Sequence, residues 1–229
     1  MSIYTGGKNS EGIYQRLINL MPPHRVYIEL YLGSGAILRH KRPAETNIGV
    51  EIDLEVIERF TYPRGCKINN LNAIEFLQRH SRNPGFDRNT LIYADPPYVR
   101  STRADQTRDY YRYEMSDQDH ACLLEALLDS TNFGAKVMIS GYRCDLYDRA
   151  LSHWRRVDYP VQLRGGGKAV ESVWCSFKEP FELHDYSYLG ENYRERQDIK
   201  RQQQRWRARL EQLPPQKRYA LLSVINEKI

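Results

Sequence analysis

The sequence lacks several patterns that would assign it to a common class of protein. Its four cysteines, at positions 66, 122, 144 and 175, form no C-x-x-C pair, so the sequence indicates neither a zinc site nor a disulfide framework, and we expect no metal. No run approaches the roughly 20 apolar residues of a membrane span. The start, MSIYTGGKNS, has no charged-then-apolar signal pattern. These absences predict a cytoplasmic protein with reduced, mostly buried thiols.

What the sequence does contain is enough apolar material for one full domain. The chain has 229 residues, of which 41% are hydrophobic, so one α/β domain with an appendage is the expected size. The net charge is only +5, but arginines cluster locally and tyrosines number 17. Clustered arginine beside tyrosine favours a polyanion as partner, although a basic enzyme of another kind fits the composition too.

Short apolar runs alternate with helical patterns along the first 180 residues. We expect buried strands at 26–31, 47–52, 90–94 and 136–140, a further strand at 66–68, and helices at 10–21, 72–80 and from Ser116. Ser116 and Asp119 form the pattern of a capping box. Two runs flanking Arg164 to Lys168 predict an antiparallel hairpin with a glycine turn. This order predicts a mostly parallel, doubly wound Rossmann-like α/β sheet closed by that hairpin.

Beyond Phe181 the composition becomes polar and basic. The segment ENYRERQDIKRQQQRWRARLEQL carries only a narrow apolar seam, which predicts a long polar helix that ends at Pro214-Pro215 before a last helix at 216–228. We therefore divide the chain into a main α/β domain at 1–183 and a basic helical extension at 184–229. The extension either follows phosphates or pairs with a second copy to form a homodimer.

Two polar turns follow the first two predicted strands. Because ligands of open α/β sheets bind beyond the carboxyl ends of the strands, these turns are candidate binding elements. The first, Leu32-Gly33-Ser34-Gly35, lets a backbone approach a ligand closely, although many such turns are only tight connections. The second turn carries Glu51 and Asp53. An acidic side chain at this place can accept hydrogen bonds from two ribose hydroxyls. Asp53 also suits the N-cap position of a helix.

The third turn, Asp95-Pro96-Pro97-Tyr98, has the most specific chemistry. Prolines end the strand and present carbonyl acceptors without donors, so Asp95 and the Pro96 carbonyl form a stiff corner that only accepts hydrogen bonds. Such a corner suits an amino group. The lone pair of a purine amine is delocalised into the ring, and two acceptors that bind its hydrogens favour the tetrahedral geometry that frees it for attack. Tyr98 would stack on a base flipped out of a duplex.

Three motifs together resemble those of Dam-like S-adenosylmethionine-dependent DNA adenine methyltransferases, particularly the short phage and prophage members. Residues 4–8, YTGGK, match the N-terminal cofactor motif, residues 29–35, ELYLGSG, match the E-P-F-x-G-x-G loop, and residues 95–98 match the catalytic D-P-P-Y. The likeness covers residues 4 to about 177. It implies the cofactor S-adenosyl-L-methionine and these cofactor-binding residues: Gly6, Gly7, Lys8, Glu29, Tyr31, Gly33, Gly35, Glu51, Asp53, Asn72 and Asp95. It likewise implies these catalytic residues: Asp95, Pro96, Pro97 and Tyr98.

The sequence departs from the family pattern at three places. Leu30 and Tyr31 replace a proline and a phenylalanine, and Asn72 stands where an acid contacts the cofactor adenine, which its side-chain carbonyl can still do. Only 22 residues separate Asn72 from Asp95, too few for the target-recognition insert of larger relatives. The target sequence must therefore be read by another part of the chain.

The stretch after the catalytic corner is the first candidate for nucleic-acid contact, because arginines pair with phosphates or guanine edges while tyrosines stack on bases. A solvated loop is the alternative. The hairpin turn is a second candidate. The predicted nucleic-acid-binding residues are Arg100, Arg103, Arg108, Tyr110, Tyr111, Arg112, Arg164 and Lys168.

The sequence thus predicts a site-specific methyltransferase that acts on the 6-amino group of adenine, with double-stranded DNA as partner and no membrane. It does not encode whether the enzyme acts alone or beside a restriction nuclease. Adenine in structured RNA is a close alternative, and the cytosine amine is chemically similar. A protein amide fits less well, because amide-methylating relatives begin this corner with Asn. A non-catalytic nucleic-acid binder on the same fold is the alternative of another class.

Overall fold

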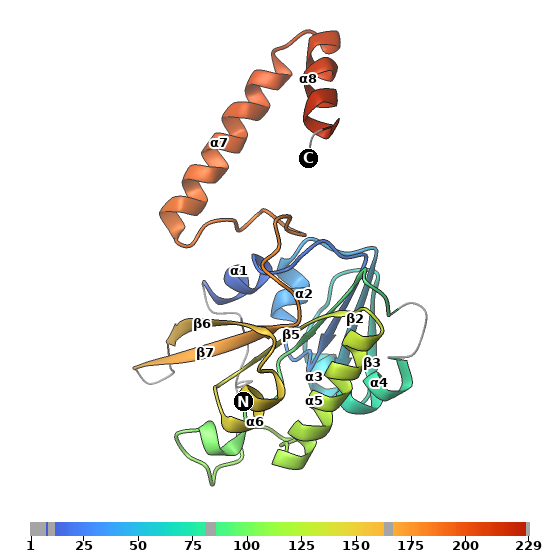
Figure 1. Cartoon of the computed structure of the whole chain (residues 1–229), viewed down its shortest axis with the longest axis vertical. Helices are drawn as coiled ribbons and strands as arrows, with labels where there is room; N and C mark the ends of the chain where they lie inside the picture. Colours follow the sequence, from blue (N-terminus) through green and yellow to red (C-terminus); the bar gives the residue numbers. More distant parts are fainter. Residues whose placement is uncertain (1–7, 9–11, 81–85, 163–166, 228–229) are drawn as a thin grey trace. The chain divides into compact units, whose positions relative to one another are not determined.

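The first unit of the chain is built on one mixed sheet. The structure, a computed structural model, describes residue 8 and residues 12–80, 86–162 and 167–227, and the chain divides into the units Met1–Asp185 and Tyr186–Ile229. The strands are β1 (Val26–Leu30), β2 (Thr46–Glu51), β3 (Cys66–Asn70), β4 (Thr90–Ala94), β5 (Lys136–Gly141), β6 (Arg155–Gln162) and β7 (Lys168–Cys175). Within the described residues they run in the order β3-β2-β1-β4-β5-β7-β6 (Figure 1).

The pairing of the strands confirms the predicted class of sheet. β1 pairs in parallel with β2 and β4, β2 with β3, and β4 with β5, whereas β7 is antiparallel to both β5 and β6. The order reverses at β1, whose two parallel neighbours β2 and β4 lie on opposite sides of it. A crevice for ligands is therefore expected at the carboxyl ends of these three strands.

Helices connect the strands and cover the sheet. They are α1 (Ile13–Ile18), α2 (Ala36–His40), α3 (Leu54–Arg59), α4 (Ala73–His80), α5 (Asp117–Asn132) and α6 (Asp145–Ala150), with a 3₁₀ turn η1 (Arg100–Thr102). The capping box of α5 is confirmed, because the Ser116 side chain accepts from the Asp119 N–H while the Asp119 carboxylate accepts from the Ser116 N–H. Such reciprocal bonds satisfy donors that the first helical turn leaves open.

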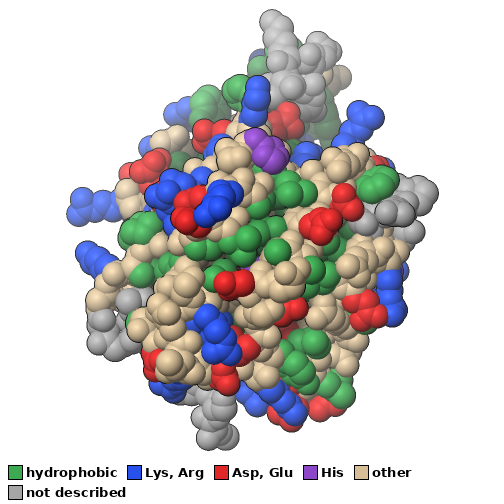
Figure 2. Space-filling model, turned by 60° about the horizontal axis from the view of Figure 1, so that its bottom comes forward, with side chains coloured by type: hydrophobic (Ala, Val, Ile, Leu, Met, Phe, Trp, Pro, Cys, Tyr) green, Lys and Arg blue, Asp and Glu red, His purple; other side chains and the backbone are tan. Residues whose placement is uncertain are grey.

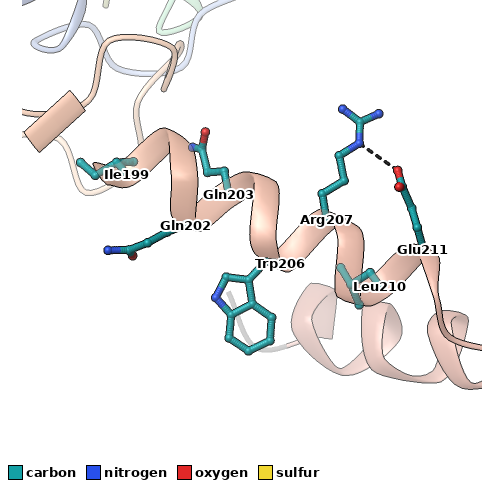
Figure 3. A pocket seen from close by; sticks show the side chains of 7 residues that line it. All are labelled: Ile199, Gln202, Gln203, Trp206, Arg207, Leu210 and Glu211. Carbon is teal, nitrogen blue, oxygen red and sulfur yellow. Dashed lines mark hydrogen bonds and ion pairs between the residues drawn. The ribbon is translucent and has the colours of Figure 1, made fainter. Parts of the chain in front are cut away.

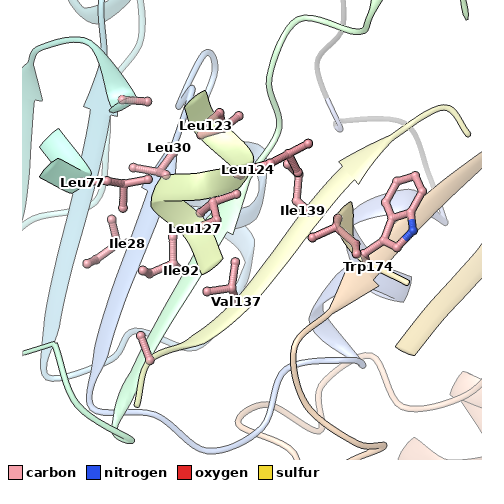
Figure 4. Packing of buried hydrophobic residues seen from close by; sticks show 14 of the residues in the cluster. Ile28, Leu30, Leu77, Ile92, Leu123, Leu124, Leu127, Val137, Ile139 and Trp174 are labelled. Atoms are coloured by element: carbon pink, nitrogen blue, oxygen red, sulfur yellow. The ribbon is translucent and has the colours of Figure 1, made fainter. Parts of the chain in front are cut away.

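The main hydrophobic core lies between one face of the sheet and helices α4, α5 and α6 (Figure 4). Ile28 and Leu30 of β1 and Ile92 of β4 pack there against Leu123 and Leu127 of α5, all fully buried. Side chains alternate between the two faces along a strand. The positions between the core residues therefore face the other side of the sheet, and they are Tyr27, Glu29, Tyr93 and Asp95. On that side of the sheet the Glu29 carboxylate accepts from the Leu38 N–H of α2.

Most predicted elements are confirmed, with small shifts of their ends. The strands predicted at 26–31, 47–52, 66–68, 90–94 and 136–140 correspond to β1, β2, β3, β4 and β5, and the hairpin is formed by β6 and β7. The first helix is shorter than predicted, since α1 begins after Gly12, and Ser10 lies outside the described residues. The thiols are less buried than expected: only Cys175 is buried, and the other three are half-buried.

The second unit consists of two helices, α7 (Tyr193–Glu211) and α8 (Pro215–Glu227). Asn192 caps α7 by accepting from the Glu195 N–H, and none of the α7 side chains is buried. Ile199, Trp206 and Leu210 line a shallow groove along α7, beside the Arg207–Glu211 ion pair (Figure 3). None of the helices in the described part of the chain combines the length and apolar character needed to cross a membrane.

Candidate active site

The carboxyl ends of β1, β2 and β4 and the loop that follows β4 share one pocket. Its described lining residues are Tyr31, Glu51, Ile52, Asp53, Val56, Asp95, Pro97, Tyr111, Arg112 and Tyr113. The first seven are the ends of strands and the start of α3, and the last three come from the loop. Residues from three predicted motifs therefore meet at the crevice that the strand order defines.

Asp95 begins the corner directly after β4. The following prolines are buried, Asp95 itself is half-buried, and its Oδ1 is a buried atom without a hydrogen-bond partner among the described residues. Burial raises the pKa of Asp95 to about 6, against the opposing effect of the Lys8 ammonium. Asp95 therefore brings a carboxylate with a raised pKa to the lining of the pocket.

Lys8 lies against this corner from the N-terminal segment. Its Nζ is 3.1 Å from Asp95 Oδ1, where the two groups form an ion pair. Nζ does donate to the Tyr98 hydroxyl and, at 2.9 Å, to Glu171 Oε2. Burial by itself lowers the pKa of Lys8, but the facing carboxylates outweigh it and hold the pKa above its ordinary value.

Glu171 and Tyr159 belong to this cluster although the sequence did not single them out. They face each other across the β6–β7 hairpin, and the Tyr159 hydroxyl donates to Glu171 Oε2 at 3.1 Å. The available indication was an acid inside the apolar stretch AVESVWC. An acid at a buried strand position requires partners, which here are Lys8 and Tyr159.

The glycine turn after β1 is tightly folded. Gly33 and Gly35 have positive φ angles of 51° and 63°, and Tyr31, a non-glycine residue, has a φ of 56°. A left-handed tyrosine is uncommon and costs of order 1 kcal/mol or more, and such residues concentrate at ligand sites. The hydroxyl of Tyr62, which the sequence did not indicate, donates to the Gly33 carbonyl at 2.8 Å.

Glu51 is held rigidly at the pocket by backbone groups. Its Oε2 accepts from the Gly33 N–H at 2.8 Å and its Oε1 from the Asp53 N–H at 3.0 Å. Burial raises the pKa of Glu51, although these two bonds oppose the effect. Asp53 caps α3 by accepting from the Glu55 N–H, as its alternative reading predicted, and it lines the pocket as well.

Of the predicted cofactor residues that do not line the pocket, Glu29 and Asn72 have carboxyl or amide oxygens engaged by other parts of the protein. Glu29 Oε2 accepts from the Tyr27 hydroxyl at 2.9 Å and from the Leu38 N–H at 2.7 Å, so its carboxylate is directed toward α2. Asn72 Oδ1 caps α4 by accepting from the Ile74 N–H at 2.8 Å and the Glu75 N–H at 3.3 Å. The carbonyl expected to contact an adenine is therefore already used by the helix.

Arg103 also differs from its predicted role in nucleic-acid contact. Its Nη1 and Nη2 donate to both oxygens of Glu114, at 2.9 and 2.6 Å, and its Nε donates to the Tyr98 carbonyl at 2.7 Å. Glu114 Oε1 additionally accepts from the N–H groups of Tyr110 and Tyr111. With all three donor nitrogens occupied inside the protein, Arg103 braces the loop and is not placed to bind a phosphate.

The other predicted nucleic-acid residues are closer to solvent. Arg100 pairs with Asp109, and Arg112 pairs with Glu55 at 2.7 Å and with Asp53 at 3.5 Å. Arg108 is exposed and lies 5.2 Å from the centre of the Tyr110 ring. Figure 2 shows Lys or Arg and Asp or Glu side chains interspersed on the face that it presents. The contacts of Arg100 and Arg112 are surface ion pairs. Such pairs stabilise a protein little, so a ligand can replace them at a small cost in free energy.

Three predicted site residues, Gly6, Gly7 and Arg164, lie outside the described residues. Lys168 is exposed at the start of β7, where it faces Gln162 across the hairpin. Within the described part of the chain, no group of three or more His, Cys, Asp or Glu side chains is arranged to hold a metal ion.

Comparison with known proteins finds one family that is similar to part of this chain. Residues 65–162 match the family described as D12 class N6 adenine-specific DNA methyltransferase, and this segment includes Asp95 to Tyr98. No protein of curated function matches the sequence.

Solved structures with a similar fold are distant. A SAM-dependent methyltransferase from Agrobacterium tumefaciens is 12% identical, with 72% of this chain and 60% of that chain covered and a TM-score of 0.47. A dimethyladenosine transferase from Plasmodium falciparum is 13% identical, with 73% of this chain and 61% of that chain covered and a TM-score of 0.47. A precorrin-6y C5,15-methyltransferase from Geobacter metallireducens is 9% identical, with 76% of this chain and 92% of that chain covered and a TM-score of 0.48.

Likenesses at this level carry no argument about the substrate, and the class of fold rests on the strand order itself. That order, with β7 inserted antiparallel beside β5, is the Rossmann-like arrangement that the motifs predicted. Residues 65–162 are thus similar to a family of adenine-specific DNA methyltransferases, and the sheet that contains them has the order of a Rossmann-like fold.

Proposed function

We propose that this protein transfers a methyl group from S-adenosyl-L-methionine to the exocyclic 6-amino group of an adenine in DNA. The observation that carries the proposal is that Asp95, the first residue of the D-P-P-Y corner, lines the same pocket as Glu51. The match to a family of adenine-specific DNA methyltransferases supports adenine in DNA as the substrate.

The described residues of the pocket fit such a cofactor. Glu51 has both oxygens fixed by backbone N–H groups, and each oxygen keeps a lone pair for a ribose hydroxyl. Ile52 and Val56 supply apolar surface beside it for the adenine ring. Asp95 lines the same pocket, where its negative charge would face a sulfonium group.

When bound, the cofactor would supply an electrophilic methyl group: the adenine nitrogen would gain a bond to that carbon as the carbon–sulfur bond broke, and the sulfur would keep the electron pair as a neutral thioether. Asp95 Oδ1 and the Pro96 carbonyl would accept the two amine hydrogens and so turn the nitrogen lone pair toward the methyl group. Once alkylated, the nitrogen carries a positive charge and must release one proton. Asp95, whose carboxylate lines the pocket, is placed to accept it.

Tyr98 would hold the flipped base. Its hydroxyl is fixed by Lys8, its carbonyl by Arg103, and its ring lies edge-on to Tyr142 with 4.7 Å between the centroids. A ring held at three points loses little further conformational entropy when a base stacks on it. Arg100, Arg108 and Arg112 would contact the phosphates around the extruded nucleotide.

The test is methyl transfer from labelled S-adenosyl-L-methionine to nucleic acid. We expect incorporation into double-stranded DNA as 6-methyladenine, none with Asp95→Ala, and normal incorporation with Asp158→Asn, which removes an exposed carboxylate on β6. Mapping the modified bases would give the target site. Label found only in RNA or only in cytosine would replace the proposed substrate, and cofactor binding without transfer to any of these would leave a non-catalytic binder.

A further inference from the structure

Glu171 is a buried acid whose partners connect it to the catalytic corner. It lies on β7 with 7% of its surface exposed, and both of its described side-chain bonds, from Lys8 and from Tyr159, end on Oε2. It does not line the pocket itself. A buried carboxylate that takes no part in ligand contact needs another reason for its position, because burying a charge is unfavourable unless it is paired.

The geometry around Lys8 provides that reason. The ammonium has three N–H groups, and it donates to Glu171 Oε2 and to the Tyr98 hydroxyl. Its third neighbour, Asp95 Oδ1, lies 3.1 Å away and forms an ion pair with it. Glu171 and Tyr98 thus hold two of the three N–H groups of the ammonium away from Asp95.

Charge and hydrogen bond have opposite effects on the proposed reaction. A nearby positive charge keeps a buried carboxylate ionised, which it must be in order to accept hydrogens only. A strong hydrogen bond from the same ammonium would instead occupy the lone pair that the substrate amine needs. If Glu171 carried no charge, Lys8 would turn toward its one remaining carboxylate and close that acceptor.

We propose that Glu171 is a positioning residue of the methyl-transfer site: it holds the Lys8 ammonium on its own carboxylate and so weakens the hold of Lys8 on the Asp95 carboxylate, which the substrate amine needs as an acceptor. The effect of Glu171 on catalysis rests on the proposed function, whereas its effect on the charge of Asp95 does not. Glu171 acts through Lys8 and contacts neither substrate nor cofactor.

The variant that tests it is Glu171→Gln, which preserves shape and removes the charge. We expect kcat to fall about tenfold or more, with the KM for S-adenosyl-L-methionine unchanged because the pocket keeps its lining. Asp158→Asn, a carboxylate lost from the same hairpin where it pairs with Arg156 at 3.0 Å, should change neither value. In a Lys8→Met background, Glu171→Gln should reduce kcat little further, since its route through Lys8 is gone.

A second readout needs neither cofactor nor activity: the titration of Asp95 in the free protein by carbon NMR of labelled carboxyl groups. Several charged or titratable groups on the surrounding elements interact electrostatically with Asp95. They are Lys8, Glu171, Tyr159, Tyr93, Tyr98, Tyr111, Tyr27, Glu29 and Tyr147. Two of these groups, Glu171 and Glu29, are carboxylates, and the variant changes only Glu171. The pKa of Asp95 should fall below its value of about 6, both because a negative neighbour is lost and because Lys8 turns toward it.

The outcomes separate the two proposals. An active wild-type enzyme whose Glu171→Gln variant keeps its kcat and its Asp95 titration would overturn the positioning role and leave the function standing. A wild-type protein without methyl transfer would overturn the function, whereas the shifted Asp95 titration would still establish that Glu171 holds Lys8 away. Equal losses of kcat in the Lys8→Met and wild-type backgrounds would show that Glu171 acts through general stability and would also overturn the role.

Discussion

Arg103 and Glu114 form a two-pronged ion pair that joins the catalytic corner to the end of the loop that follows it. The two N–H···O contacts measure 2.9 and 2.6 Å, and the side chains are 6% and 12% exposed. Through Nε the same guanidinium holds the Tyr98 carbonyl, and through Oε1 the same carboxylate holds the N–H groups of Tyr110 and Tyr111. One pair therefore fixes Tyr98 and two aromatic residues of the loop together.

Removing one partner of this pair should destabilise the protein strongly. Arg103→Ala leaves the Glu114 carboxylate largely buried and without its counter-charge, and breaking a buried pair in this way costs on the order of 3 kcal/mol. Arg100→Ala removes an arginine from an exposed pair on the same loop and should cost about 1 kcal/mol or less. Urea unfolding measures both. Equal changes in the free energy of unfolding would contradict the bracing role.

The activity should be lost in acid because Asp95 must be ionised. Its pKa of about 6 is raised above the ordinary value by burial, so as the pH falls through about 6 the carboxylate gains a proton and ceases to be a pure acceptor. The profile of kcat/KM against pH reports groups of the free enzyme, so its acidic limb should lie near 6. A limb near the ordinary carboxyl value of 3.8 would contradict this assignment.

Lys8→Met should move that acidic limb in the opposite direction to Glu171→Gln. The Lys8 ammonium lowers the pKa of Asp95, and without it burial and the negative charge of Glu171 act unopposed. The limb of kcat/KM should therefore shift above about pH 6, with the rate at high pH also reduced because the Tyr98 hydroxyl loses its partner. Full pH profiles of both variants check the two directions, and a shift of the same sign in both would exclude the arrangement of charges described here.

The local parts of the site were predictable because short motifs determine them. Asp95 to Tyr98 follow an apolar strand, and two prolines dictate a stiff turn wherever they follow one. Glu51 and the Gly33–Gly35 turn were found by the same reasoning, since the ends of neighbouring parallel strands must meet. The capping box at Ser116 is likewise local, and it occurs where the sequence placed it.

The long-range parts were not predictable from spacing. Glu171 lies 163 residues from Lys8, and only the register of β6 against β7 brings it to the corner. Arg103 looked like a phosphate ligand because nothing local shows that Glu114 folds back to meet it. Asn72 and Glu29 carry the right chemistry for a cofactor, but a helix N-terminus takes the first and the start of α2 takes the second.

Glu29→Gln tests the corrected position of that residue. Both hydrogen bonds to Glu29 end on Oε2, so a glutamine carbonyl can accept both, and the Kd for S-adenosyl-L-methionine measured by calorimetry should not change. Burial raises the pKa of Glu29 from 4.5 to about 8, so the folded protein binds a proton there that the unfolded chain does not. Wild-type stability relative to the variant should therefore fall as the pH rises from 4.5 to about 8. A loss of cofactor affinity would return Glu29 to the binding site.

Arg108→Ala should weaken DNA binding without changing the chemical step. Among the residues that the structure describes, no carboxylate lies within ion-pair distance of its guanidinium, which rests beside the Tyr110 ring and remains exposed to a phosphate. Losing one phosphate contact reduces the slope of log K against log salt by about 1. Arg79→Ala is the charge-matched control, because Arg79 lies on α4 and pairs with Glu75. If both variants give the wild-type salt slope and the same affinity, the loop does not contact the backbone through Arg108, and the exposed arginines of the basic helix α7 become the next to test.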